Sequence, residues 1–470
     1  MAPVRSRALD TLVDPRSVAI IGGASDRPFS LGQRAVANLL DHSDVEGRTI
    51  HLINRTSPQI RGIDTVPSVL DLPEAPDVAE LVVPPAAATL PVLRECAEIG
   101  VKYAVVFTSG FGEMGPPEGK AAEAEMAALA RESGMRIYGP NSPPGLCNNN
   151  ARLGLMFSPV LLPGSTARPD RLGHSGRRRG PLLPAGHGAR GGRGVGLWAS
   201  TGNEVDLTVA DFIHYMAEAD DIKVIATAME GIRDGDAFVD ACLHAAERGG
   251  KPVVGMKVGR SEYGARAVAS HTGSISGAAE VNSAVFKQVG IIEVDDMDEL
   301  IDTAALLTRA APPKASPPKY AVYGFSGGGC AMASDALGHA GLEMAEFTPQ
   351  TLQRFEEVLP DYAAWTNPVD ATSDILTKPE IGGPSLLATC EDANTDLVVY
   401  PPFPCDYEEL TGQIGHTIVE TQAQTQTPPI VPIWMSDRLG SGYQALVDGG
   451  MLPIGSIRRG SPRCAAGRSA

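Results

Sequence analysis

The chain of 470 residues has 43% hydrophobic and 20% charged side chains, enough apolar surface for two to four folded domains, which excludes a wholly disordered chain. Its 52 glycines and 38 prolines follow no three-residue period, so they indicate many short loops and exclude a collagen-like sequence. A net charge of −17 disfavours a nucleic-acid partner, because neutralising phosphates requires a basic surface.

The sequence also shows no signal for export, for a membrane or for a metal. The N-terminus lacks the apolar core of a signal peptide, and no run approaches the roughly 18 apolar residues of a membrane helix. The seven cysteines are scattered, without a Cys-x-x-Cys pair or a histidine at ligand spacing. We therefore expect a cytoplasmic protein with buried free thiols, no metal site and no membrane partner.

Strands alternate with helices along the first 150 residues. Strands are predicted to begin at Ser17 and to cover 49–55, 79–85, 103–110 and 135–141. Helices are predicted over 31–40, 87–100 and 118–133. This alternation indicates a mostly parallel sheet, in which ligands bind beyond the carboxyl ends of the strands. Each of those ends carries Gly, Ser, Thr, Asn or Pro.

Two further α/β blocks follow. The second block, from about 194 to 309, has predicted strands near 195–200, 223–230, 252–258 and 290–294. The third opens after a Pro-rich linker, 311–319, with a strand, a glycine turn and a helix, and has further strands at 396–403 and 429–436. We therefore predict three doubly wound α/β domains, over 10–150, 155–310 and 319–455, and an irregular tail over 456–470.

A glycine turn, Gly22-Gly23-Ala24-Ser25, follows the first strand. Such a turn brings main-chain amides to a helix N-terminus, where they can meet a phosphate. The next strand ends in Asn54-Arg55 and not in the acidic residue that a nicotinamide ribose requires. The pattern therefore favours a phosphate-bearing nucleotide over NAD, with an ordinary tight turn as the alternative.

The segment VGRSEYGARAVASHTGSISG, 258–277, is predicted to be a polar loop. A loop of this length between two α/β elements is longer than a simple connection needs, so it indicates a functional role. Its only group that titrates near neutral pH is His271, which can act as a nucleophile or carry a proton when a partner fixes its tautomer. A solvated surface histidine is the alternative.

A third glycine turn, Ser326 followed by Gly327, Gly328 and Gly329, precedes an alanine-rich helix. Successive glycine amides at a helix N-terminus can bind an anion. A plain strand-to-helix turn is equally compatible with this pattern.

These motifs occur in an order that resembles one known family. The segments GGAS, VVPP, FTSGF, GPNS, STGNE, MEGIRDG, SHTGSISG, SGGG and TNPVD are similar to those of the NDP-forming acyl-CoA synthetases. This family is related to succinyl-CoA synthetase and to ADP-forming acetyl-CoA synthetase. The resemblance covers nearly all of 14–455, and SHTGSISG and TGNE are its most specific parts. It implies a Rossmann-like CoA-binding domain followed by two flavodoxin-like domains of the succinyl-CoA synthetase type.

The resemblance also implies a set of site residues. The histidine of the Ser-His-Thr-Gly segment, His271, becomes phosphorylated, and the carboxylate of Glu230 in MEGIRDG supports its imidazole. Gly327, Gly328 and Gly329 present a helix N-terminus to the phosphate. The positions that match the coenzyme A site are Gly23, Ala24, Ser25, Asn54, Val83, Pro84, Thr108, Ser109 and Gly110.

The implied reaction converts a small carboxylic acid, CoA and ATP to acyl-CoA, ADP and phosphate. It proceeds through the phosphohistidine and an acyl phosphate. The ATP, with its Mg²⁺, is expected to come through an ATP-grasp subunit or domain, because none follows residue 455. We also expect an oligomer.

The sequence departs from the family pattern in two further places. Between Asp170 and Gly194, 25 residues contain six arginines, eight glycines and one acidic residue, where the family has a Ser-x-Ser-Gly turn and a helix. We interpret this stretch as a frame disturbance, because GC-rich codons read out of frame yield Arg, Gly, Pro and Ala, and expect impaired turnover. The segment GPNSPPG, 139–145, carries an extra proline beside the CoA positions.

Two other functions remain open at this point. A non-catalytic CoA-binding protein or regulatory pseudoenzyme would bind CoA without forming phosphohistidine. An NAD-linked oxidoreductase is disfavoured by the missing acidic ribose residue, and a failure to bind NADH would exclude it.

Overall fold

The structure is a computed structural model that describes most of the chain as two compact units. Within the described residues the first unit ends at Val294 and the second begins at Asp295. The described residues are 9–22, 30–114, 117–142, 145–155, 195–247, 250–272, 279–308, 317–403, 406, 408–425, 429–436 and 438–455. The Arg/Gly stretch 170–194, the extra proline region 143–144 and the tail 456–470 lie outside them.

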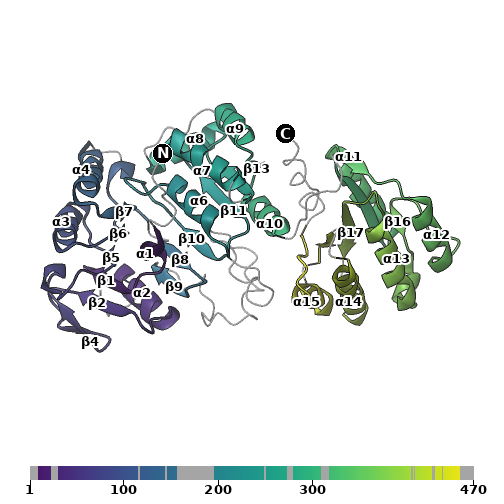
Figure 1. The fold of residues 1–470 in the computed structure, drawn as a ribbon, viewed down its shortest axis with the longest axis horizontal. Coiled ribbons are helices and arrows are strands. Elements are labelled where there is room, and N and C mark those ends of the chain that lie inside the picture. Colours follow the sequence, from purple (N-terminus) through teal and green to yellow (C-terminus); the bar gives the residue numbers. More distant parts are fainter. Residues whose placement is uncertain are drawn as a thin grey trace. The chain divides into compact units, whose positions relative to one another are not determined.

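The first unit begins with a seven-stranded sheet in the order β3-β4-β2-β1-β5-β6-β7 (Figure 1). All its pairings are parallel except that of β3 with β4. The strands are β1 (Ser17–Ile21), β2 (Thr49–Ile53), β3 (Gln59–Ile60), β4 (Ile63–Val66), β5 (Val78–Leu81), β6 (Tyr103–Val106) and β7 (Arg136–Tyr138). The helices are α1 (Asp10–Val13), α2 (Leu31–Ala37), η2 (Asn38–His42), η3 (Val69–Asp71), η4 (Ala86–Ala88), α3 (Thr89–Ile99), η5 (Gly112–Met114) and α4 (Pro117–Ser133).

Helices cover both faces of this sheet because neighbouring strand residues point to opposite sides. Val18 and Ile20 of β1 pack in one core with Val36 and Leu39, whereas Ala19 and Ile21 pack in another with α3 and α4. The strands are apolar on both faces, as expected for a parallel sheet between two helical layers. The predicted α/β fold of this part of the chain is confirmed.

The segment VGLWAS belongs to a different sheet from the one predicted. It forms β10 (Leu197–Ala199), which pairs antiparallel with β8 (Leu146–Asn148), and β8 pairs antiparallel with β9 (Leu153–Leu155). The prediction of a strand was right, but its assignment to the second parallel sheet was wrong. The pairing joins Leu197 to Asn148, two residues so far apart in the sequence that no local pattern reveals it.

A second parallel sheet, β11-β12-β13, completes the first unit. Its strands are β11 (Ile225–Met229), β12 (Val253–Lys257) and β13 (Ile292–Val294). Its helices are α6 (Val209–Glu218), α7 (Gly235–Glu247), α8 (Glu262–Thr272) and α9 (Ala279–Gln288). Phe238 of α7 and Phe286 of α9 meet in its core with ring centroids 6.2 Å apart. Phe212 of α6 packs into the core of the first sheet, so the two sheets of this unit share apolar contacts. The domain boundary predicted near 150–155 remains a prediction.

The second unit has a five-stranded sheet in which β14 also pairs with β16. The strands are β14 (Lys319–Gly324), β15 (Glu343–Met344), β16 (Val369–Asp370), β17 (Leu397–Phe403) and β18 (Ile430–Trp434). The helices are α10 (Met297–Leu307), α11 (Gly327–His339), α12 (Pro349–Val358), η7 (Ser373–Leu376), α13 (Pro379–Glu391), α14 (Glu409–Gln424) and α15 (Ser441–Asp448). Tyr323 and Tyr400 face one core and Tyr320 and Val399 the other, so this sheet too is covered on both faces.

Candidate functional site

The predicted CoA positions gather at the carboxyl edge of the seven-stranded sheet. Gly22 follows β1, Asn54 follows β2, Val83 and Pro84 follow β5, and the turn 108–110 follows β6. The chain runs from β1 to β2 on one side and returns to β5 on the other, which makes the edge between β1 and β5 a topological switch point. Ligands of doubly wound sheets bind at such a point. The residues Gly23, Ala24 and Ser25 lie outside the described part of the chain.

Gly22 contacts Val83 across the switch point. Its backbone has a φ of +82°, and a Cβ atom there would lie 2.5 Å from Cγ2 of Val83. Only glycine adopts this conformation readily and leaves room for the neighbouring strand. The glycine at the start of the GGAS turn is therefore required by the local geometry, with or without a phosphate.

Hydrogen bonds join the turns after β5 and β6. The main-chain amide of Val83 donates to the hydroxyl of Thr108 at 3.1 Å, and the Thr89 hydroxyl donates to the carbonyl of Val83 at 3.1 Å. Thr108 is buried, whereas Ser109 and Gly110 are exposed. Thr108 thus shapes the edge, and Ser109 and Gly110 are the residues of this turn that a bound molecule can reach.

Asn54 uses its side chain to close its own turn. Its Oδ1 atom accepts hydrogen bonds from the amide of Thr56 at 2.8 Å and from that of Ser57 at 2.9 Å. The guanidinium of Arg55 lies 3.7 Å from Glu95 and is largely exposed. At this edge Asn54 fixes the backbone, and Arg55 is a cation that a phosphate can reach.

His271 lies in a helix and not in a loop. The segment 262–272 forms α8, with His271 in its last turn. Ser261 begins the helix by accepting a hydrogen bond from the amide of Gly264 at 3.1 Å, and Arg266 stacks on the ring of Tyr263. The prediction of a 20-residue loop was therefore wrong for its first part, because the Ala-rich run has good helix propensity and a serine cap. Residues 273–278 lie outside the described part.

The helix that carries His271 packs against η5, which directly follows the predicted CoA turn. Glu230 follows β11 at the carboxyl edge of the second parallel sheet and is half-buried. The structure thus brings the histidine helix next to the β6 turn within one unit. The predicted pairing of Glu230 with His271 stays a prediction.

A buried polar cluster at the same junction was not predicted. One amide nitrogen of Asn203 donates to Oε2 of Glu113 at 2.6 Å and to Oε1 of Glu123 at 2.7 Å. All three side chains are less than one-tenth exposed. Glu113 in turn accepts from the amide of Gly110 at 2.5 Å, and Glu123 accepts from that of Gly112 at 3.1 Å. The TGNE motif was the available signal, but its partners lie 90 and 80 residues away in the sequence.

The GPNS and STGNE segments hold each other in place. Asn141 donates to the Oδ1 atom of Asn203 at 3.3 Å, and the Ser142 hydroxyl donates to the carbonyl of Ser200 at 2.6 Å. Gly202 has a φ of +66°, and a Cβ there would meet the carbonyl of Pro140 at 2.2 Å. These motifs therefore build the junction between the first sheet and the rest of the unit.

In the second unit the predicted glycine turn begins α11. Ser326 caps the helix, and its hydroxyl accepts from the amide of Gly329 at 3.3 Å. A Cβ on Gly327 would lie 2.8 Å from Oδ2 of Asp370, so a carboxylate faces the positive end of this helix, whereas Gly328 faces open space. A phosphate at Gly327–Gly329 would share that position with a negative charge. The phosphate site remains a prediction.

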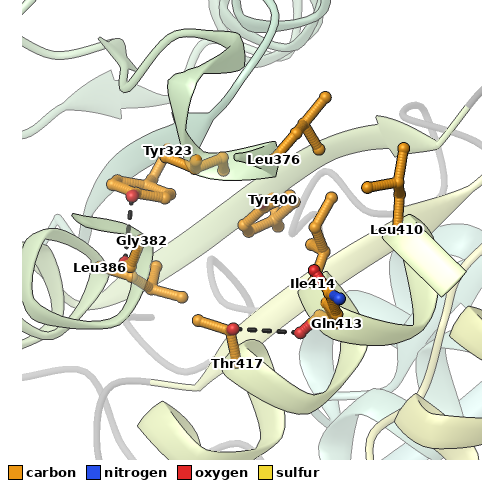
Figure 2. A pocket seen from close by; sticks show the side chains of 10 residues that line it. Tyr323, Leu376, Gly382, Leu386, Tyr400, Leu410, Gln413, Ile414 and Thr417 are labelled. Carbon is orange, nitrogen blue, oxygen red and sulfur yellow. Dashed lines mark hydrogen bonds between the residues drawn. The ribbon is translucent and has the colours of Figure 1, made fainter. Parts of the chain in front are cut away.

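Figure 2 shows a pocket in the second unit that is lined by the sheet, η7, α13 and α14. Its walls are mainly apolar, and the Tyr323 hydroxyl beside it is bonded to Ser385 at 2.6 Å and to the carbonyl of Gly382 at 3.1 Å. The lining residues are Tyr323, Ile375, Leu376, Gly382, Leu386, Tyr400, Leu410, Gln413, Ile414 and Thr417. None of these is charged or among the predicted site residues.

The cysteines in the described part of the chain are all buried. Cys96, Cys147, Cys242, Cys330 and Cys390 are buried thiols outside any disulfide, as predicted, while the other two lie outside the described residues. Burial raises the pKa of Cys96, Cys147, Cys242 and Cys330 to about 12, so these four are thiols at neutral pH. Across the described ranges, no cluster of three metal-ligating side chains occurs and no helix is long and apolar enough to cross a membrane.

Comparisons with known families agree with the arrangement of the first unit. Residues 16–144 match the family described as a CoA binding domain. Residues 183–307 match the family described as a succinyl-CoA ligase like flavodoxin domain. The first match covers the sheet that carries the switch point, and the second covers β11 to β13 with α8 and continues through α10 of the second unit.

Individual relatives point to the same family. The chain is 33% identical over 391 residues to the acetate–CoA ligase (ADP-forming) II subunit alpha of Pyrococcus furiosus, covering 83% of this chain and 81% of that subunit. It is 36% identical to acetate–CoA ligase (ADP-forming) I of Archaeoglobus fulgidus, over 83% of this chain but only 54% of that longer protein. The chain belongs to the family of NDP-forming acyl-CoA synthetases, which are acid–thiol ligases.

A solved structure is similar to this chain along most of its length. The structure of dinucleotide-forming acetyl-coenzyme A synthetase 1 of Candidatus Korarchaeum cryptofilum, in complex with phosphate and ADP, matches with a TM-score of 0.80 and 27% identity. The match covers 98% of this chain and 96% of that one. The resemblance inferred from the motifs is thereby confirmed, as is the order of a Rossmann-like CoA-binding domain and a flavodoxin-like domain.

Proposed function

We propose that this chain is the α-subunit-like part of an ADP-forming acyl-CoA ligase. It would convert a small carboxylic acid, CoA and ATP to acyl-CoA, ADP and phosphate. The observation that carries this proposal is the packing of α8, which bears His271, against η5 beside the turn 108–110. A histidine that carries a phosphoryl group must reach the place where the acyl group meets CoA, and the packing of α8 beside the proposed CoA turn supports that role.

The chemistry assigned to the chain's own residues is simple. His271 attacks the γ-phosphoryl group in line, so that a nitrogen–phosphorus bond forms as the bond to ADP breaks. Glu230 is proposed to hold the other ring nitrogen and to stabilise the positive charge that develops on the imidazole. The carboxylic acid then takes the phosphoryl group from His271, and the CoA thiol displaces phosphate from the acyl phosphate.

CoA is proposed to bind at the switch-point edge, with its phosphates near Gly23, Ala24, Ser25 and Arg55. The support is the match of 16–144 to a CoA binding domain and the geometry of Gly22, Val83 and Thr108. Ser109 and Gly110 would contact the bound CoA, because both are exposed at the end of β6.

The nucleotide is proposed to come through an ATP-grasp partner, with Mg²⁺ accompanying it. The support is that this chain covers most of a protein named as an α subunit but only about half of the longer Archaeoglobus relative. An oligomeric assembly and a cytoplasmic location belong to the same proposal.

The test is phosphorylation of the full chain by ³²P-labelled acetyl phosphate, which needs no ATP-grasp partner. We expect an acid-labile, base-stable label on the wild type and none on His271→Asn. Binding of CoA by the same preparation is measured by calorimetry, with NADH as the competitor. An unlabelled wild type that still binds CoA would favour a non-catalytic CoA-binding protein, and a fully labelled His271→Asn would place the nucleophile elsewhere.

A further inference from the structure

A buried lysine lies at the carboxyl end of the central strand of the second parallel sheet. Lys257 is the last residue of β12, and its relative exposure is 5%. Lysine is almost never buried to this extent unless its ammonium group is paired. Neither the sequence motifs nor the comparisons give this residue a role.

The ammonium group of Lys257 joins two turns. Its Nζ atom donates to the main-chain carbonyl of Glu230 at 2.8 Å and to that of Val258 at 2.6 Å. Glu230 is the first residue after β11, and Val258 is the first residue of the connection that leads to α8. One cation therefore ties the turn that carries Glu230 to the point where the chain leaves the sheet toward the histidine helix.

The positive charge of Lys257 also interacts with the carboxylate of Glu230. Burial lowers the pKa of the Lys257 ammonium group, and the nearby Glu230 carboxylate offsets only part of this shift. In a water-poor site this attraction is stronger than at the surface. Lys257 thus constrains the backbone of the Glu230 turn and places a positive charge near its carboxylate.

We propose that Lys257 is a positioning residue of the phosphohistidine site. It fixes the Glu230 turn and the start of the α8 connection, so that the carboxylate and His271 meet in the orientation that phosphoryl transfer requires. This inference rests on the function proposed above. Lys257 acts through Glu230 and the backbone, because its two hydrogen bonds go to the main-chain carbonyls of Glu230 and Val258.

The chain supplies a matched control at the other end of the same strand. Lys251 precedes β12, and its Nζ atom donates to the carbonyl of Met216 at 3.0 Å and to that of Ala219. Lys251→Met therefore removes the same chemistry as Lys257→Met, but away from Glu230. Both variants keep an unbranched apolar stem of similar length.

The experiment measures the initial rate of ³²P labelling from acetyl phosphate on the full chain, as a function of acetyl phosphate concentration. We expect Lys257→Met to lower the maximal rate about 10- to 100-fold, the usual cost of losing a supporting contact in comparable sites. The half-saturating concentration and the CoA affinity should change less than about twofold, because the buried ammonium group of Lys257 is bonded to two main-chain carbonyls. Lys251→Met should label at the wild-type rate.

The labelling rates of the two lysine variants test the positioning role directly. A folded Lys257→Met that labels normally, or a Lys251→Met that loses as much activity, would overturn the positioning role. If Lys257→Met does not fold, Lys257→Gln, which removes the charge but keeps an N–H donor, takes its place with the same expected loss of rate. An unlabelled wild type would instead overturn the proposed function, which separates the failure of that function from the failure of this inference.

Discussion

The side-chain amide of Asn203 donates a hydrogen bond to Oε2 of Glu113 at 2.6 Å, and both residues are less than one-tenth exposed. The same nitrogen donates to Glu123 at 2.7 Å, so one amide holds two buried carboxylates. Glu113 accepts from the amide of Gly110, the last residue of the predicted CoA turn. The Asn203 contact therefore connects the TGNE motif with the turn that ends β6.

Asn203→Ala should destabilise the first unit and weaken CoA binding. Hydrogen bonds to charged groups are each worth roughly 1.5 to 3 kcal/mol, and their loss leaves two buried carboxylates underpaired. The control is Asn150→Ala, because Asn150 also donates to a carboxylate, that of Asp221, but is exposed. Chemical unfolding and calorimetric titration with CoA are the measurements. Equal, small effects of the two substitutions would show that the buried cluster adds nothing to stability or binding.

Glu80 should make the stability of the first unit fall as the pH rises. It lies in β5 between Ile20 and Val105, fully buried, and neither carboxyl oxygen has a hydrogen-bond partner in the described part of the chain. Burial raises its pKa from 4.5 to about 8. Between these values the folded protein keeps a proton that the unfolded chain has lost, so stability decreases by roughly 1.4 kcal/mol per pH unit and levels off above about pH 8.

Glu80→Gln tests this dependence because it keeps the shape of the neutral acid and cannot ionise. Near pH 4.5 the variant should match the wild type, and at about pH 8 it should be more stable by a few kcal/mol. Unfolding curves at about pH 4.5, 6 and 8 provide the comparison, with Glu118→Gln on the exposed face of α4 as the control. Parallel pH profiles of the wild type and Glu80→Gln would mean that Glu80 is not a neutral core residue.

Gly22→Ala should be more harmful than the same change at another glycine with positive φ. Gly22 has a φ of +82° and a Cβ atom on it would lie only 2.5 Å from Val83, whereas Gly47 has a φ of +75° and nothing within 4 Å. Gly47→Ala carries only the backbone cost of about 1–2 kcal/mol. Gly22→Ala must also displace Val83 at the switch point, so both its Tm and its CoA affinity should fall further. Similar losses in the two variants would leave the close contact without consequence.

The sequence predicts the α/β scaffold well because its signals are local. An apolar run ending in glycine, such as the one that closes at Gly22, specifies a strand and a turn without reference to distant residues. The helix around His271 was missed because its serines and glycines outweighed a short Ala-rich segment. The sequence did not predict the clusters at Asn203 and Lys257, because the burial of a polar residue depends on partners that only the fold brings together.

Glu230 has two groups with different proposed roles, a carboxylate beside His271 and a main-chain carbonyl that accepts from Lys257. Glu230→Gln removes the negative charge but leaves the main-chain carbonyl that accepts from Lys257. We expect phosphate labelling of His271 to slow about 10- to 100-fold with no change in the unfolding midpoint greater than a few degrees. Glu262→Gln, an exposed carboxylate in the first turn of α8, serves as the control and should label normally. Labelling of Glu230→Gln at the wild-type rate would remove Glu230 from the phosphohistidine chemistry and leave it only as the backbone partner of Lys257.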